Sequence, residues 1–298
     1  MTATVDVKVT REIAETAKVS QKARIGAFSV IGPHVVIGPG TVIGRGSTVV
    51  GHTTIGRDNV FGDGCVLGAL PQDLKYAGEE TYLLIGDRNR IEAKVTAHVG
   101  TGSGGFLTRI GSDNHLGAFT HIAHDCFVDD RTRLGHGVLL AGHVRVEDGA
   151  VVEDFTGAHH FTTIGRYSRV GGGTPVRRDV PPFTQYWAVG HYEVRGMIRG
   201  AHEAGLAAAG LGADEQALLR EAIRFLFEDE NALAVKAQRL MDGGGLTPSV
   251  QVLCEFCQAS LSGKFGRCRE LFRGKLPLES RAYLPPAALA RIDAGGSA

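Results

Sequence analysis

The stretch RIGAFSVIGPHVVIGPGTVIGRG, residues 24–46, repeats the pair Ile-Gly every six residues. Stepping by six from Val7 to Leu67 meets an apolar residue every time. A helix repeats every 3.6 residues and a strand every two, so neither alone produces a period of six. That period is typical of a parallel β-helix, in which each repeat forms a short strand and a turn and points its aliphatic residue inward. We therefore predict a parallel β-helix from residue 7 to about residue 180.

The six-residue frame is interrupted twice. It lapses through PQDLKYAGEE (71–80) and slips by one residue across GTGSGGF (100–106), then continues from Ile110 to Val176. We expect two loops to leave the β-helix there, over residues 69–84 and 99–109. Three faces of six residues make about 18 residues per coil and roughly ten coils, so residues 18 apart stack about 4.8 Å from one another.

Known hexapeptide-repeat proteins coil left-handedly, and the resemblance to them implies the same hand here. After residue 183 the pattern changes, because ADEQALLREAIRFLFED (213–229) places apolar residues at helical spacing. We predict an all-β left-handed parallel β-helix over residues 1–183 and a small α-helical C-terminal domain over residues 184–272. A Pro/Ala-rich tail over residues 273–298 is expected to be partly disordered.

Composition excludes several classes of protein. The formal net charge is zero, which argues against a broad nucleic-acid interface. No apolar run approaches the roughly 20 residues of a membrane span, and the N-terminus lacks the apolar core of a secretory signal. The five cysteines are an odd, scattered set, typical of free thiols in a reducing compartment. We predict a cytoplasmic protein without nucleic-acid partners.

Eight of the twelve histidines fall between residues 98 and 160, and the motif THIAHDC (120–126) places two of them beside Asp125. Three interpretations were open: a polar surface, a metal site, and a general base. Imidazole suits zinc, but the γ-type carbonic anhydrases of similar architecture use histidines five residues apart, and no pair here has that spacing. We favour a base, because imidazole has an ordinary pKa of about 6.5 and can accept a hydroxyl proton; we predict no metal.

Several motifs carry a family resemblance: GHTTIGRDN (51–59), QDLKYAGE (72–79), IGDRNRI (85–91), IGSDN (110–114), HIAHDC (121–126), LAGHV (140–144) and DVPP (179–182). Over residues 7–268 the chain resembles the acyl-carrier-protein-dependent UDP-N-acetylglucosamine O-acyltransferases, which begin lipid A synthesis. The resemblance implies an acyl-carrier-protein thioester donor, a sugar-nucleotide acceptor, no cofactor, and a homotrimer with sites between subunits.

The same resemblance implies roles for individual residues. It makes His124 the general base with Asp125 beside it, and it assigns an oxyanion-stabilising N–H to Gly142, one coil along from His124. The implied mechanism is direct transfer without an acyl-enzyme, so Cys126 is predicted to be structural and to lie on the same face as His124. The residues predicted to contact sugar or acyl chain are Gln72, Asp73, Lys75, His121, His143, His159, His160 and Gly172.

The chain departs from the family pattern at several of these places. His160 stands where the family usually has Gln, and Glu153-Asp154 replaces Gly-Gly beside the acyl groove. An unpaired carboxylate is costly against methylenes, so we expect Asp154 to pair with His136, one coil below. Glu203 and Ala204 replace two arginines of the nucleotide handle. These changes keep two alternatives open: an acyltransferase for another sugar or a shorter, more polar acyl donor, and a catalytically inactive trimeric scaffold or binding protein.

Overall fold

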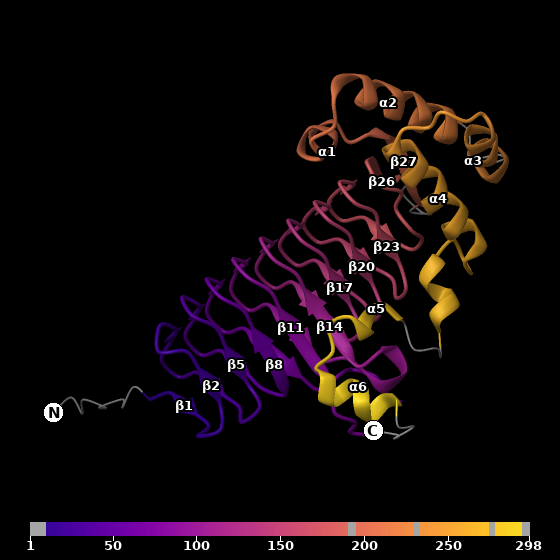
Figure 1. Ribbon diagram of the computed structural model, residues 1–298. Helices are drawn as coiled ribbons and strands as arrows, with labels where there is room; N and C mark the ends of the chain where they lie inside the picture. The colour runs from indigo at the N-terminus through magenta and orange to yellow at the C-terminus, as the bar shows by residue number, and fades with distance from the viewer. Residues whose placement is uncertain (1–9, 190–194, 229–232, 274–277, 294–298) are drawn as a thin grey trace.

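A computed structural model of the protein describes residues 10–189, 195–228, 233–273 and 278–293 (Figure 1). Its first 25 strands wind into a three-sided prism with one parallel sheet on each side. The first sheet contains β1 (Glu12–Ile13), β4 (Val30–Ile31), β7 (Thr48–Val49), β10 (Val66–Ala69), β13 (Thr96–His98), β16 (His121–Ile122), β19 (Leu139–Leu140), β22 (Gly157–Ala158) and β25 (Pro175–Val176). The second contains β2 (Lys18–Val19), β5 (Val36–Ile37), β8 (His52–Ile55), β11 (Tyr82–Ile85), β14 (Leu107–Ile110), β17 (Phe127–Val128), β20 (Arg145–Val146) and β23 (Thr163–Ile164). The third contains β3 (Arg24–Ile25), β6 (Val42–Ile43), β9 (Val60–Phe61), β12 (Arg90–Ile91), β15 (His115–Leu116), β18 (Arg133–Leu134), β21 (Val151–Val152), β24 (Arg169–Val170), β26 (Thr184–Val189) and β27 (Arg195–Ala201).

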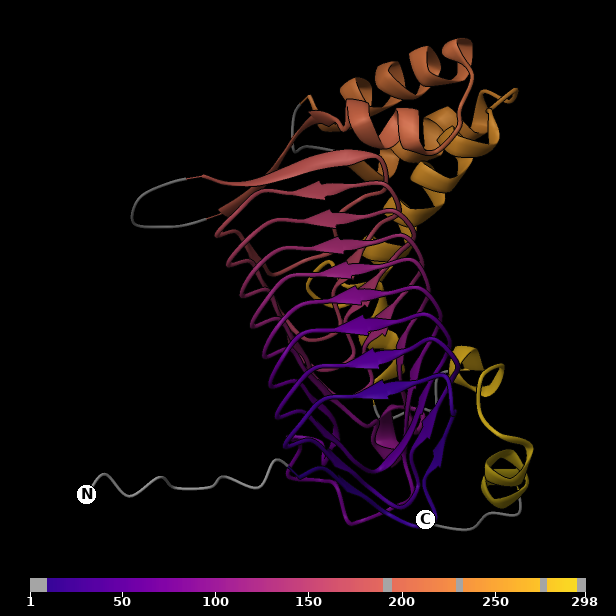
Figure 2. The same ribbon diagram turned by 90° about the vertical axis from the view of Figure 1, so that its left-hand side faces the viewer.

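The six-residue period sets the register of these sheets. His121 pairs with Leu139 and Leu139 pairs with Gly157, so strand partners lie 18 residues apart as predicted. The frame residues form one core down the centre of the prism, where Ile31, Ile37 and Ile43 are each only 1% exposed. The glycine that follows an inward residue lies against the next coil: a Cβ on Gly44 would stand 2.2 Å from the Gly62 carbonyl oxygen. The predicted left-handed parallel β-helix is confirmed, and Figure 2 shows its regular coils.

Both interruptions leave the prism along one edge, where the chain passes from the first sheet to the second. One lies between β10 and β11 and the other between β13 and β14. They are shorter than predicted, because β11 and β14 begin early and pair over four residues, from Tyr82–Leu107 to Ile85–Ile110. The second loop contains the short 3-10 helix η1 (Gly102–Gly104). The next turn along this edge, residues 123–126, carries the HIAHDC motif.

The first part of the predicted helical domain is not helical. β26 pairs in parallel with β24 and antiparallel with β27, so residues 184–201 extend the third sheet. The segment TQYWAV (184–189) is rich in aromatic and β-branched residues, which favour strand. Helices begin only after this hairpin: α1 (Glu203–Ala208), α2 (Ala213–Phe227), α3 (Leu233–Asp242) and α4 (Pro248–Ser262), followed by the 3-10 helix η2 (Cys268–Phe272).

Helices α1 to α4 lie at the C-terminal end of the prism, beside its last coils (Figure 1). They share a second core in which Leu206, Leu219 and Leu253 are fully buried. Cys254 and Cys257 belong to this core and are buried. None of the described helices is long and apolar enough to cross a membrane.

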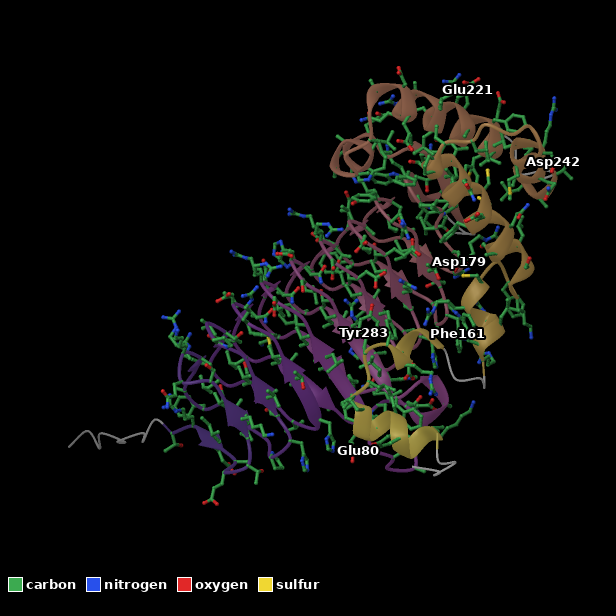
Figure 3. All side chains as sticks on the ribbon, viewed as in Figure 1. Glu80, Phe161, Asp179, Glu221, Asp242 and Tyr283 are labelled. Atoms are coloured by element: carbon green, nitrogen blue, oxygen red, sulfur yellow. The ribbon has the colours of Figure 1, made fainter. Side chains whose placement is uncertain are left out.

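The described part of the C-terminal tail contains two short helices. These are α5 (Leu278–Arg281) and α6 (Pro286–Asp293), which run back along the side of the prism (Figures 1 and 2). Leu284 and Ala288 are buried in a small cluster with Tyr82, Leu107 and Phe127 of the second sheet. The Arg109 guanidinium also lies 4.5 Å from the centre of the Tyr283 ring (Figure 3). The tail is held because it covers apolar side chains that the inserted loops leave at this edge.

Candidate active site

A groove of about 500 Å³ runs over the outer face of the first sheet beside the edge that carries both loops. Its floor is made of small residues, among them Ala141, Gly142 and Gly157. Four of the predicted site residues line it with Gly142: Gln72, His121, His124 and His159. Apart from its two chain neighbours, no described residue has an atom within 4 Å of where a Cβ of Gly157 would stand, so the groove is open at that point.

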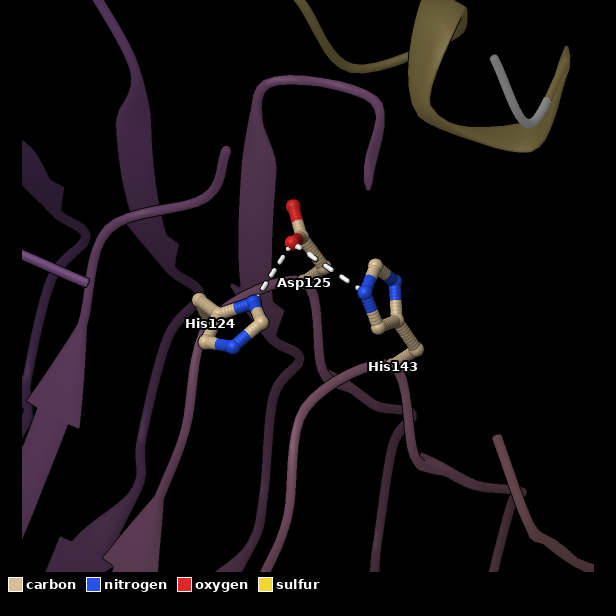
Figure 4. Close-up of side chains that lie close together, drawn as sticks. All are labelled: His124, Asp125 and His143. Atoms are coloured by element: carbon tan, nitrogen blue, oxygen red, sulfur yellow. Dashed lines mark hydrogen bonds and ion pairs between the residues drawn. The ribbon is translucent and has the colours of Figure 1, made fainter. Parts of the chain in front are cut away.

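His124 and Asp125 form a hydrogen-bonded dyad at the turn between β16 and β17 (Figure 4). His124 Nδ1 lies 2.7 Å from Asp125 Oδ2, and Asp125 is completely buried. A hydrogen bond donated by Nδ1–H to this carboxylate leaves the other ring nitrogen, Nε2, as an acceptor. The turn places Asp125 in left-handed backbone with a φ of 60°, a conformation that Asp tolerates.

The inserted loop over residues 99–106 holds the carboxylate of Asp125. The Thr101 hydroxyl donates to Oδ2 at 2.7 Å, and the Thr101 backbone N–H donates to Oδ1 at 2.8 Å. The Asp125 N–H in turn donates to the Thr108 hydroxyl at 2.8 Å. Gly104 completes the enclosure, because a Cβ there would stand 2.0 Å from the Asp125 carboxyl carbon. Thr101 was not among the predicted site residues; the slip of the six-residue frame across GTGSGGF is the one signal in the sequence that points to this loop.

The first inserted loop is tied to the second by Glu79. Its carboxylate accepts hydrogen bonds from the N–H of Gly102 at 2.7 Å and from the N–H of Ala77 at 2.8 Å. Burial raises the pKa of Glu79, but these backbone donors outweigh burial and leave it lowered. The same loop carries Gln72 into the groove, while Lys75 is exposed and its N–H donates to Asp73 Oδ1 at 2.9 Å.

His143 lies one coil along, at the same edge, with Nε2 3.8 Å from Asp125 Oδ2. Its ring stacks on Phe161 with the centroids 4.2 Å apart. Burial lowers the pKa of His143 to about 4, so the ring is neutral at pH 7. The negative charges of Asp125 and then Asp73 oppose that effect, which puts Asp73 within electrostatic reach of the site.

His121 lies on β16, and its Nδ1 is 2.8 Å from the Thr96 hydroxyl. Burial lowers the pKa of His121, with smaller contributions from His98 and His124. Gly142 packs under the His124 ring, since a Cβ there would stand 2.5 Å from His124 Cε1. The Gly142 N–H donates to no acceptor among the described residues, which leaves it available to a ligand.

Six of the eleven predicted site residues do not line the groove: Asp73, Lys75, Asp125, His143, His160 and Gly172. His160 faces the C-terminal domain, with Nε2 4.0 Å from Glu270 Oε1, and burial lowers the pKa of His160 to about 4. Gly172 lies near a different corner, where its N–H donates to Glu153 Oε2 at 3.0 Å. The 18-residue spacing places residues in a column, but it does not say which way a side chain turns when another domain packs beside it.

Two other expectations need correction. Cys126 does not share the face of His124: it is 0% exposed in the prism core, its Sγ donates to the Ala141 carbonyl, and burial raises its pKa to about 12. The turn between the two residues breaks the strand alternation on which that expectation relied. The Asp154–His136 contact exists, but it is the His136 backbone N–H that donates to Asp154 Oδ1, at 2.8 Å.

Comparisons with known proteins agree with this architecture. Residues 16–51 match the family described as bacterial transferase hexapeptide (six repeats). The acyl-carrier-protein-dependent UDP-N-acetylglucosamine O-acyltransferase of Stenotrophomonas maltophilia R551-3 is 39% identical over 203 residues, which is 68% of this chain and 76% of that protein. Its counterpart from Xylella fastidiosa is 40% identical over 204 residues, with the same two coverages.

Solved structures are similar as well. The UDP-N-acetylglucosamine acyltransferase of Francisella novicida superposes with a TM-score of 0.78 at 27% identity, over 83% of this chain and 89% of that one. LpxA from Acinetobacter baumannii gives a TM-score of 0.75 at 33% identity, over 83% and 94% of the two chains. With this coverage and identity, the chain belongs to the family of acyl-carrier-protein-dependent UDP-N-acetylglucosamine O-acyltransferases.

Proposed function

We propose that the protein transfers an acyl group from an acyl-carrier-protein thioester to a hydroxyl of UDP-N-acetylglucosamine, with His124 as the general base. Membership of the family makes the chain an acyltransferase, and its relatives are named for this donor and acceptor. The observation that carries the assignment of the base is the dyad: a groove-lining imidazole whose Nδ1 is held by a fully buried carboxylate.

The chemistry follows from the arrangement of hydrogen-bond donors and acceptors. His124 Nε2 takes the proton of the sugar hydroxyl as its oxygen attacks the thioester carbonyl. Asp125 stabilises the imidazolium that forms, and the Gly142 N–H stabilises the negative charge on the tetrahedral oxygen. When the intermediate collapses, the carbon–sulfur bond breaks and the thiolate takes the proton from His124. No covalent enzyme intermediate is needed, in keeping with the inward position of Cys126.

We also propose that the protein is a homotrimer whose neighbouring subunits close the groove. Large apolar side chains are exposed on β19, which lines the groove, and in the turns before β16 and β22 of the same sheet: Leu139 is 53% exposed, Phe119 61% and Phe155 75%. A neighbouring subunit would remove these side chains from water. Light scattering on the purified protein should give three times the 31.6 kDa chain mass, and a monomer would contradict the shared-site proposal.

A shorter or more polar acyl donor is a second candidate, favoured by the two carboxylates near Gly172. Glu153 is bonded to the Gly172 N–H and ion-paired with Arg169, while Asp154 is exposed. Both carboxylates have polar partners. A long methylene chain packed against them would displace water from these charges, which costs free energy.

The test is mass spectrometry of reactions that contain the protein, UDP-N-acetylglucosamine and a panel of acyl-carrier-protein thioesters of different length and polarity. We expect an acylated nucleotide sugar with the wild type and none with His124→Ala, and the product mass gives the acyl group. Thioester consumption without an acylated nucleotide sugar would show that UDP-N-acetylglucosamine is not the acceptor, and other sugars would then be tested. No consumption of any thioester, with the trimer intact, would favour the inactive scaffold.

A further inference from the structure

The residues that replace the family's two arginines do not line the groove of His124. Glu203 forms an ion pair with Arg220 at 2.8 Å, and both line a separate cavity between β27 and α2. The departure seen in the sequence therefore leaves the described groove without a cation from that segment. A nucleotide sugar carries a diphosphate, so a member of this family that retains such a substrate needs a positive charge elsewhere.

Arg177 supplies such a charge. It follows β25 and lines the same groove as His124. Ala123, Ala141, His159 and Arg177 are spaced by 18 residues and therefore form one column. Arg177 is three coils from Ala123, which is about 14 Å along the prism at the usual strand spacing. Arg177 therefore lies at the end of the groove nearer the C-terminal domain, and its side chain can extend back toward the dyad.

The charge of Arg177 is not neutralised in the described structure. No Asp or Glu is among the described residues that line the groove. Arg177 is exposed, and its guanidinium makes no ion pair with any described residue. An arginine without a carboxylate partner, in a groove with no acidic side chain among its described lining residues, matches a phosphate, to which guanidinium can donate two parallel hydrogen bonds.

The backbone of Arg177 is held in place by the C-terminal domain, which distinguishes this arginine from a freely moving surface residue. Its carbonyl accepts a hydrogen bond from Arg267 Nη1 at 3.1 Å. Arg267 is only 6% exposed and is itself paired with Glu270. The C-terminal domain thus fixes the last coil where the groove ends, so the direction from which the Arg177 side chain leaves is set before a ligand binds.

We propose that Arg177 binds a phosphoryl group of the substrate in the groove, replacing the lost arginines at residues 203 and 204. This inference rests on the proposed function. Two sources share the chemistry: the diphosphate of the nucleotide sugar and the phosphodiester of the phosphopantetheine arm on the donor. We assign Arg177 to the diphosphate, because the acceptor sugar must lie at His124 and its diphosphate continues along the groove.

Arg178 provides the matched control. It carries the same charge one residue along, but it lines a different cavity, between the last coil and α4, together with Asp179 and Tyr186. Replacing either arginine removes one positive charge from the same turn. Only a direct contact with the ligand can make the two replacements differ strongly.

The first experiment measures binding of UDP by calorimetry to the full-length protein and to Arg177→Ala, Arg177→Lys and Arg178→Ala, each with its oligomeric mass and melting temperature checked. We expect Arg177→Ala to weaken binding roughly 10- to 100-fold, as loss of hydrogen bonds to a charged group does. Arg177→Lys should recover part of the loss, and Arg178→Ala should stay within about twofold. Equal losses in Arg177→Ala and Arg178→Ala, unchanged binding in Arg177→Ala, or no binding of UDP by the wild type would each overturn the assignment to the diphosphate.

The second experiment separates the sources by steady-state kinetics. A rise in KM for UDP-N-acetylglucosamine, with KM for the thioester unchanged, places the acceptor's diphosphate on Arg177. A rise in KM for the thioester alone places the donor's phosphodiester there and overturns the acceptor assignment. The calorimetry needs no turnover, so an inactive wild type that binds UDP through Arg177 would refute the proposed reaction and leave this site supported.

Discussion

Two pairs of histidines lie in neighbouring coils along the same edge of the prism, and only one pair forms a dyad with a buried acid. The rings of His34 and His52 stack face to face with their centroids 4.3 Å apart, and His34 is exposed. The acid next to this pair is Glu80, whose Oε2 lies 4.0 Å from His52 Nε2 and whose side chain is 34% exposed. His124 and His143 meet edge to face at 5.3 Å around the buried Asp125.

The difference lies in what the neighbouring inserted loop does at each pair. His34 lies in the turn after β4 and His52 begins β8; the inserted loop between β10 and β11 places Glu80 Oε2 4.0 Å from His52 Nε2 and leaves this carboxylate partly exposed. Directly below His124 the loop over residues 99–106 folds over the edge, and Thr101 and Gly104 enclose the carboxylate. The repeat supplies the same rigid edge in both places. A preorganised site arises where an insertion excludes water from an acid and orients it.

Asp125→Asn should have the largest effect, because it removes the acid that distinguishes the two pairs. Asn tolerates the left-handed backbone at this position. An amide NH₂ can donate to His124 Nδ1, which would move the ring proton to Nε2 and abolish the base. We expect kcat, measured by acylated-sugar formation, to fall about 10⁴-fold with the oligomeric mass unchanged. A variant with more than a tenth of wild-type kcat would show that the acid is not needed to orient His124.

His143→Asn should change how stability depends on pH. The folded-state pKa of His143 is about 4, below the roughly 6.5 of an unfolded histidine. The unfolded chain therefore binds the proton more tightly, and this residue lowers the free energy of unfolding as pH falls from about 6.5 to about 4. The full effect is on the order of 3 kcal/mol at the acid end.

The measurement is urea unfolding of wild type and His143→Asn at fixed protein concentration between pH 7.5 and pH 4.5. At pH 7.5 the variant should be less stable, because it loses the ring stacked on Phe161. The gap should narrow or reverse toward pH 4.5, since Asn has no proton to gain. Parallel curves across the range would mean that His143 titrates normally in the folded state.

Thr101→Val tests the inserted loop itself, since valine has nearly the shape of threonine without its hydroxyl. The Thr101 hydroxyl donates to the same Asp125 oxygen that accepts from His124, and it also accepts from the Gly104 N–H at 3.1 Å. We expect kcat to fall about tenfold with both KM values unchanged. Thr101→Ser should restore most of the rate, and equal losses in the two variants would assign Thr101 to packing alone.

His34→Ala should have the smallest effect. Its ring is exposed and stacks on His52, away from the groove. We expect kcat within twofold of wild type and a change in unfolding free energy within about 0.5 kcal/mol, as for most surface substitutions. A loss of activity comparable with that of Thr101→Val would mean that the N-terminal coils also carry functional histidines.

The six-residue period of the sequence by itself determined the prism, its 18-residue register and which aliphatic residues point inward. The reason is that an apolar residue at every sixth position can be buried throughout only if each six-residue repeat contributes one inward-facing side chain. The period also placed His124, Asp125 and Gly142 on one edge. Only the tertiary structure decided which groups surround them. Thr101 reaches Asp125 through an insertion that breaks the repeat, and His160 turns to Glu270 because a separate domain packs there. Contacts that come from outside the repeating unit have no periodic signal, so they depend on how the loops and the C-terminal domain fold back on the coils.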